Sequence, residues 1–141
     1  MATAIFVNLP VSDVERSKAF FTALGYTINP QFSDENAAAV VFSDTIYAML
    51  LSEARFKDFT PKSVADARTS TEAILCLGAE SRAEVDEIAD AALANGGGRV
   101  LDPQDHGFMY GRSFADPDGH IWEVMWMDPA VASGAKSPGD I

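Results

Sequence analysis

The chain has 141 residues, 48% of them hydrophobic, which is enough for one domain or for two small modules that share a sheet. Ten Lys and Arg against 21 Asp and Glu give a formal net charge of −11, which argues against nucleic acid or an anionic membrane as the main partner. No apolar run approaches the roughly 20 residues that cross a bilayer, and the N-terminus has no signal-peptide pattern. The single cysteine, Cys76, cannot form an internal disulfide, so we expect a cytoplasmic protein.

The first 52 residues predict the order β-α-β-β-β. Alternation in the first strand places Phe6 and Asn8 on one face. Ser12 or Asp13 is suited to cap the helix that follows, and Gly25 ends it. The predicted elements are a strand at 3–11, a helix at 14–24 and strands at 26–32, 37–42 and 46–51.

The same order returns after a polar segment. Residues 53–70 predict a short helix near 55–59 and a linker, and Ser81 is suited to cap a second long helix. The other predicted elements are strands at 72–77, 99–101, 108–115 and 121–127. The expected divisions are a first module at 1–53, the helix and linker at 54–70, a second module at 71–128 and a flexible tail at 129–141.

A turn and a strand near the C-terminus carry the most informative residues. Residues 116–119, Asp-Pro-Asp-Gly, favour a hairpin because Pro fixes φ and Gly accepts a positive φ. In the strand that follows, alternation places Trp122, Val124 and Trp126 on one face and Glu123 on the other, among apolar neighbours. A carboxylate there needs a metal, a hydrogen-bonding partner or a water-lined cavity.

These features resemble a known superfamily. The two βαβββ units, the run LPVSDVERS at 9–17 and the run DPDGH at 116–120 before Glu123 resemble the vicinal oxygen chelate superfamily. It includes glyoxalase I, bleomycin-resistance and fosfomycin-resistance proteins and extradiol dioxygenases. The runs HGFMYGRSF and DGHIWEVMWMD are similar to a bacterial glyoxalase-like subgroup labelled predicted lactoylglutathione lyase. The resemblance covers about 3–127 and implies an α+β fold, in which two βαβββ modules with curved mixed sheets enclose a central cleft, and a homodimer.

The resemblance also indicates where metal ligands would stand. Metal-using members place one ligand on the first strand and one on the last strand of each module. The matching positions hold Phe6, Met49, Ile74 and Glu123. Three of the four are apolar, and a thioether is too soft for the divalent ions concerned, so only Glu123 can serve as a ligand. We therefore expect no resident metal and no other cofactor.

The expected site is an apolar cleft around Glu123, the candidate catalytic residue. Glu123 would act as a general base or accept a hydrogen bond from a ligand, unless Arg112 or a tyrosine already satisfies it. Tyr110 and Arg112 share a strand face and would either orient a planar or anionic ligand or form an ordinary cross-strand pair. The expected ligand-binding residues are Phe6, Asn8, Met49, Ile74, Phe108, Tyr110 and Arg112.

Three functions remain open from the sequence. The first is a glyoxalase-like protein with a degenerate metal site that binds a small molecule near Glu123 without a metal. The second is an isomerase of the glyoxalase I or lactoylglutathione lyase type with Glu123 as base, which would need another group to stabilise the enolate. The third is a non-catalytic protein-interaction domain. The sequence alone does not decide whether the chain is an enzyme.

Overall fold

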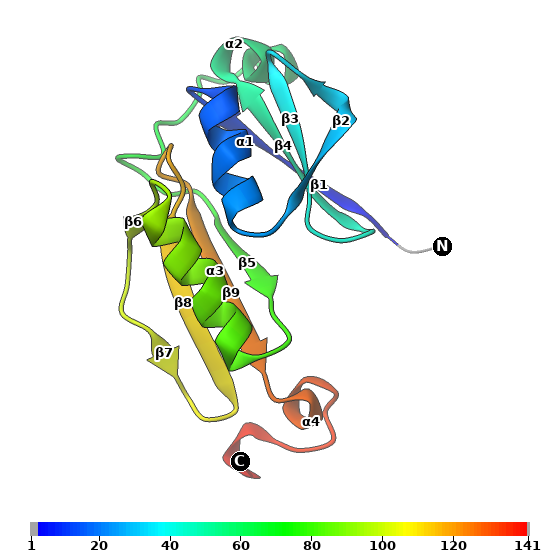
Figure 1. Ribbon diagram of the computed structural model, residues 1–141, viewed down its shortest axis with the longest axis vertical. Coiled ribbons are helices and arrows are strands. Elements are labelled where there is room, and N and C mark those ends of the chain that lie inside the picture. Colours follow the sequence, from blue (N-terminus) through cyan, green and yellow to red (C-terminus); the bar gives the residue numbers. More distant parts are fainter. Residues whose placement is uncertain (1–2, 141) are drawn as a thin grey trace. The chain divides into compact units, whose positions relative to one another are not determined.

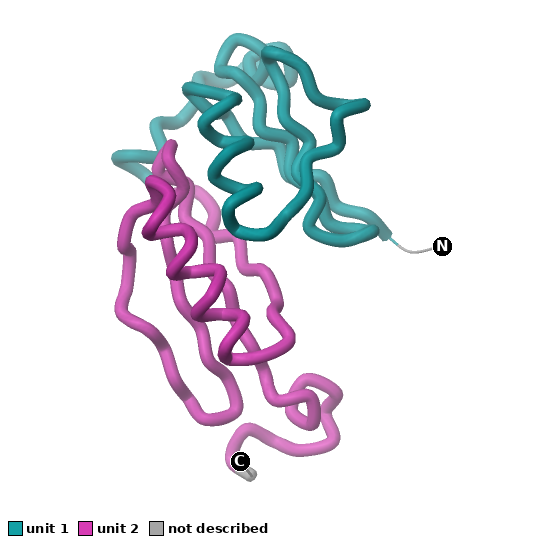
Figure 2. The backbone as a smooth tube through the Cα atoms, viewed as in Figure 1, with its two compact units in different colours: residues 1–70 teal, residues 71–141 magenta. Residues whose placement is uncertain are grey.

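A computed structural model describes residues 3–140 (Figure 1). The chain divides into two compact units, residues 1–70 and 71–141, which Figure 2 shows in different colours. Each unit contains one βαβββ run, and each is described separately below.

The N-terminal unit is a four-stranded mixed sheet with one long helix. Its elements are β1 (Ile5–Val11), α1 (Val14–Ala23), β2 (Thr27–Asp34), β3 (Ala37–Val41), β4 (Ile46–Ser52), the short helix α2 (Glu53–Phe56) and the 3-10 helix η1 (Lys57–Phe59). The strand order is β1-β4-β3-β2, with β1 parallel to β4 and the other pairs antiparallel. The first strand therefore lies at an edge and leads directly into α1.

The core of this unit forms between α1 and one face of the sheet. The Asp13 side chain caps α1 by accepting a hydrogen bond from the Arg16 N–H at 3.0 Å. Phe20 and Phe21 follow on the buried side of α1, each 1% exposed, and their rings meet edge to face with centroids 5.0 Å apart. Of the two capping residues predicted from the sequence, Asp13 is the one that caps the helix.

The C-terminal unit repeats this arrangement. Its elements are β5 (Ile74–Gly78), α3 (Arg82–Ala94), β6 (Gly98–Arg99), β7 (Gln104–Asp105), β8 (Met109–Ala115) and β9 (Ile121–Met127). The strand order is β5-β9-β8-β6, with β5 parallel to β9, and β7 also pairs with β8. Both sheets thus place the last long strand beside the first, and the predicted α+β class with two βαβββ runs is confirmed.

The hairpin between β8 and β9 fixes the register of the second sheet. Gly119 has φ of 92°, as the Asp-Pro-Asp-Gly sequence predicts. Asp116 is 4% exposed, and its carboxylate accepts hydrogen bonds from the N–H groups of Asp118 and His120 and from Trp122 Nε1, at 3.0, 3.1 and 3.0 Å. Burial raises the pKa of Asp116. The turn is therefore tied to the core through Trp122, which is 1% exposed.

Three details differ from the sequence prediction. The two-residue strand β7 was not expected, and β6 begins at Gly98 and ends at Arg99. The predicted tail contains helix α4 (Pro129–Ala132) and the 3-10 helix η2 (Pro138–Asp140). Helix α4 forms because the Asp128 side chain accepts a hydrogen bond from the Ala130 N–H at 2.8 Å and Pro129 occupies the first turn. Such short elements leave no periodic pattern. No helix within residues 3–140 is long and apolar enough to span a membrane.

Candidate functional site

Glu123 lies in the middle of β9, on the face of the second sheet opposite α3. Its neighbours in register are Cys76 on β5 and Ser113 on β8. The adjacent residues Trp122 and Val124 point to the helix side, where they are 1% and 0% exposed. Glu123 itself is half-buried. The face predicted for it by alternation is therefore confirmed.

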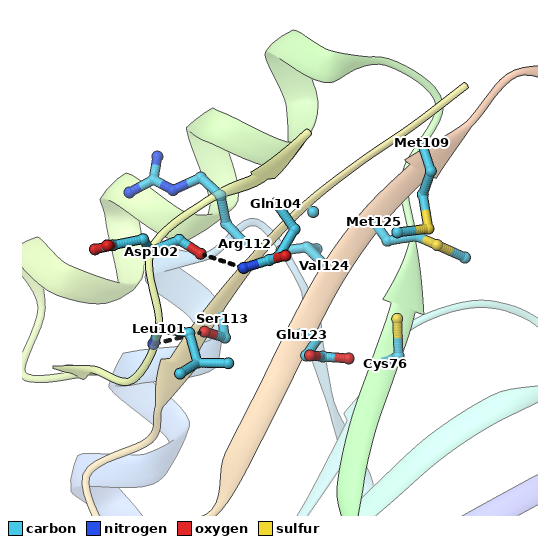
Figure 3. A pocket seen from close by; sticks show the side chains of 11 residues that line it. Cys76, Leu101, Asp102, Gln104, Met109, Arg112, Ser113, Glu123, Val124 and Met125 are labelled. Atoms are coloured by element: carbon cyan, nitrogen blue, oxygen red, sulfur yellow. Dashed lines mark hydrogen bonds between the residues drawn. The ribbon is translucent and has the colours of Figure 1, made fainter. Parts of the chain in front are cut away.

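A hollow of about 140 Å³ opens beside Glu123, entirely within the C-terminal unit (Figure 3). Strands β5, β8 and β9 form its floor, and residues 101–104 form its rim. The side chains that characterise the hollow are the thioethers of Met109 and Met125, the Glu123 carboxylate and the Gln104 amide. Its remaining lining residues are Cys76, Leu101, Asp102, Gly111, Arg112, Ser113 and Val124. An apolar surface with a few polar groups is the usual character of a small-molecule site.

Three contacts hold the rim and the residues that follow it in place. The Leu101 N–H donates a hydrogen bond to Ser113 Oγ at 3.1 Å. The Arg82 guanidinium donates two hydrogen bonds, at 2.9 and 3.0 Å, to the carboxylate oxygens of Asp105, which follows Gln104. This bidentate ion pair lowers the pKa of Asp105 to about 2. Arg82 also donates to the Gly107 carbonyl at 2.8 Å. The start of α3 therefore positions the rim of the hollow.

Tyr110 and Arg112 share a strand face as predicted, but that face is the one covered by α3. Tyr110 Oη donates to Asp86 Oδ1 at 2.7 Å, and Arg112 Nη1 contacts Asp86 and Asp90 at 3.1 and 2.7 Å. The hydrogen bond from Tyr110 and the ion pair with Arg112 lower the pKa of Asp86. Figure 3 shows the Arg112 guanidinium pointing away from Glu123. Tyr110 therefore does not line the hollow, and Arg112 borders it with its guanidinium held by α3.

Three of the other predicted residues gather in the N-terminal unit. Phe6, Asn8 and Met49 lie on one face of the first sheet, because Phe6 pairs with Tyr47 and Asn8 pairs with Met49 in the register of β1 and β4. The rings of Phe6 and Tyr47 stack with centroids 4.7 Å apart. Phe6 is 57% exposed and Met49 is half-buried. This face therefore presents apolar surface.

Ile74 and Phe108 complete the predicted set in the C-terminal unit. Ile74 shares the face of Cys76 and Glu123 and is 55% exposed. Phe108 precedes β8, and its ring lies 6.2 Å from that of His106. Its carbonyl accepts a hydrogen bond from the Asp128 N–H at 2.7 Å. Ile74 therefore shares the strand face of Glu123, but neither Ile74 nor Phe108 lines the hollow.

The donor set does not fit the metal that the resemblance implies. The four expected ligand positions hold Phe6, Met49, Ile74 and Glu123, and only the last offers an oxygen ligand. Across residues 3–140, no group of three or more His, Cys, Asp or Glu side chains gathers in a way that could hold an ion. We therefore derive no chemistry through a metal.

The comparisons with known proteins agree with this fold. Residues 3–43 match a family model described as bleomycin resistance protein-like N-terminal. A hypothetical protein from S. aureus is 28% identical with a TM-score of 0.74, and the match covers 89% of this chain and 95% of that one. A glyoxalase/bleomycin resistance protein/dioxygenase family enzyme from Burkholderia phytofirmans PsJN is 14% identical with a TM-score of 0.72, over 89% of this chain and 99% of that one. This chain has the vicinal oxygen chelate fold. The suspected resemblance to that superfamily is thus confirmed.

A further structural relative of this chain is a glyoxalase-related enzyme from Fulvimarina pelagi. It is 22% identical with a TM-score of 0.72, and the match covers 89% of this chain and 88% of that one. No curated protein matches the sequence significantly. The comparisons therefore establish the fold and the N-terminal family match, and the chemistry has to be argued from the residues.

The residues that line the hollow were mostly missed by sequence reasoning. Met109, Gly111 and Ser113 alternate with Tyr110 and Arg112 along β8, so they face the same side as Glu123. The turn at 116–119 alone does not give this register, because Ser113 pairs with Glu123 only when the five residues 116–120 connect the strands. The rim residues left no comparable local signal.

Proposed function

We propose that this vicinal oxygen chelate protein binds a small organic molecule in the hollow beside Glu123, without a resident metal. The observation that carries the proposal is the hollow itself, about 140 Å³ in volume, next to a half-buried carboxylate. An engineered protein cavity of about 150 Å³ accepts benzene, so a ring of that size matches the hollow. The thioethers of Met109 and Met125 supply adaptable apolar contact.

The same geometry gives little support to an isomerase. Proton abstraction beside a carbonyl leaves a negative charge that a cation or a set of N–H donors must stabilise. Arg112 is the one cationic residue that borders the hollow, and Asp86 and Asp90 hold its guanidinium on the other face of the sheet. Non-catalytic binding is therefore the function that these residues favour.

A glycine on β8 offers a direct test. Gly111 lines the hollow, and a Cβ added there would lie 3.5 Å from the Val124 carbonyl oxygen and 3.7 Å from Met125 Cβ, which is ordinary packing. Gly111→Val should fold and fill the hollow. Gly98→Val is the matched control, because it adds the same side chain to the same sheet outside the hollow, 3.8 Å from Ala115 Cβ.

The experiment measures amide chemical shifts by NMR while benzene-sized compounds of neutral, cationic and anionic character are added. We expect at least one compound to shift the amides around Gly111 and Ser113, with the effect lost in Gly111→Val and kept in Gly98→Val. Absence of any shift, or equal shifts in both variants, would overturn the proposal. Turnover of methylglyoxal with glutathione that disappears in Glu123→Gln would favour the isomerase.

We also propose a homodimer, as the resemblance implies. The support is exposed apolar surface on the edge strand β1 and on its neighbour β4, where Ile5, Phe6 and Ile46 are 54%, 57% and 38% exposed. Analytical ultracentrifugation tests this directly. A monomer at high micromolar concentration would contradict it.

A further inference from the structure

Among the residues that the structure describes, the Glu123 carboxylate has no counter-charge on its own face of the sheet. Within residues 3–140, no side chain or backbone N–H donates a hydrogen bond to it and no cation pairs with it. A half-buried carboxylate has lost part of its hydration, so it favours a ligand that restores a positive partner. Glu123 therefore gives the hollow a charge preference.

The cations nearest to the hollow are already paired. Arg112 is held by Asp86 and Asp90 behind the sheet. At the rim, Arg99 pairs with Asp102 at 2.9 Å, and both side chains are largely exposed. Arg82 is committed to Asp105, as described above. None of these pairs supplies a free positive charge to Glu123.

One further side chain strengthens this preference. Gln104 Nε2 donates to the Asp102 carbonyl at 3.4 Å, which leaves Gln104 Oε1 turned toward the hollow as an acceptor (Figure 3). Gln104 Oε1 therefore adds a second acceptor for a positively charged group beside the Glu123 carboxylate.

We propose that the hollow selects a compact organic cation, a protonated primary or secondary amine attached to an apolar group about the size of benzene. This inference rests on the proposed binding function. The ammonium donates to the Glu123 carboxylate and to Gln104 Oε1, and the apolar body lies against Met109 and Met125. An anion of the same shape meets the carboxylate without a compensating cation and is disfavoured.

Three probes of nearly equal shape test the inference, namely benzylammonium, benzyl alcohol and benzoate at pH 7. We expect benzylammonium to bind about tenfold or more tightly than benzyl alcohol, as hydrogen bonds to charged groups are worth that much, and benzoate to bind least. Glu123→Gln keeps the shape of the side chain and removes its charge, so it should abolish the preference for the cation. Glu87→Gln is the matched control, because it removes the same charge from an exposed position on α3.

The outcomes separate this inference from the function on which it rests. If all three probes bind equally, or if Glu123→Gln leaves their order unchanged while Gly111→Val abolishes binding, the charge preference is overturned and the binding function stands. If no probe binds, or if Gly111→Val binds as well as the wild type, both are overturned. An equal loss of the preference in Glu87→Gln would also contradict the inference, because it would trace the effect to net charge.

Discussion

Replacing Asp116 tests how the closing hairpin is tied to the core of the C-terminal unit. Asp116→Asn keeps one oxygen for the backbone N–H groups of Asp118 and His120 but turns an NH₂ group toward Trp122 Nε1. One buried donor is left without an acceptor, which costs about 1–3 kcal/mol. Asp116→Ala removes the acceptor of all three donors. Asp116→Ala also removes the cost of burying a carboxylate, which offsets part of the lost hydrogen bonding. We therefore expect the free energy of unfolding to fall by about 2–5 kcal/mol.

Urea unfolding followed by tryptophan fluorescence measures these losses. Trp122 and Trp126 are the two tryptophans of the chain and both lie in β9, so the signal reports the C-terminal unit. With a slope of about 2 kcal/mol per molar urea, the midpoint should fall by about 0.5–1.5 M for Asp116→Asn and by about 1–2.5 M for Asp116→Ala. Asp102→Asn at an exposed position is the control and should move it little. An unchanged midpoint in Asp116→Asn would refute a stabilising role for the bond to Trp122.

Three other predictions use the same structure. The pKa of Asp105 is lowered from 3.8 to about 2, so the stability that this carboxylate confers should be fully present above about pH 4 and lost as the pH falls toward 2. Arg82→Gln should remove this acid-dependent step from unfolding curves measured at different pH values. Because the pKa of Cys76 is raised, iodoacetamide should alkylate the thiol slowly at pH 7 and faster at higher pH. Glu123→Gln should shift this dependence of the alkylation rate to lower pH, and an unshifted dependence would show that the carboxylate does not act on the thiol. Ser81 Oγ caps α3 by accepting a hydrogen bond from the Glu84 N–H at 3.0 Å. Ser81→Ala should therefore reduce the free energy of unfolding by about 1 kcal/mol, and Ser81→Gly should reduce it less.

The fold could be predicted because its signals are local. Asp13 and Ser81 precede amphipathic stripes and act as helix caps, and the Asp-Pro-Asp-Gly turn specifies the hairpin with a positive φ at Gly119. The repeated strand order follows from two runs with the same pattern. These features depend on residues within a few positions of one another, which is why the sequence shows them.

The candidate site could be predicted only in part. Alternation alone placed Glu123 opposite Trp122 and Val124, and the hairpin register also identifies Ser113 as its neighbour. Arg112 was predicted to bind the ligand because of its charge and hydrogen-bonding capacity. Its partners on α3, however, are 22 and 26 residues away in the sequence. The rim of the hollow depends on the contact between Arg82 and Asp105, 23 residues apart. Such long-range pairs leave no periodic trace in the sequence.

The central claim is that the hollow beside Glu123 is a ligand site, and one titration tests it most directly. Benzylammonium is added to the wild-type protein and to Gly111→Val, and the amide resonances of Gly111, Ser113 and Glu123 are followed in the wild type. The structure predicts saturable shifts at these three positions and no binding by the variant, in which the new side chain fills the hollow. Shifts confined to other parts of the chain, or binding that survives in Gly111→Val, would contradict the claim.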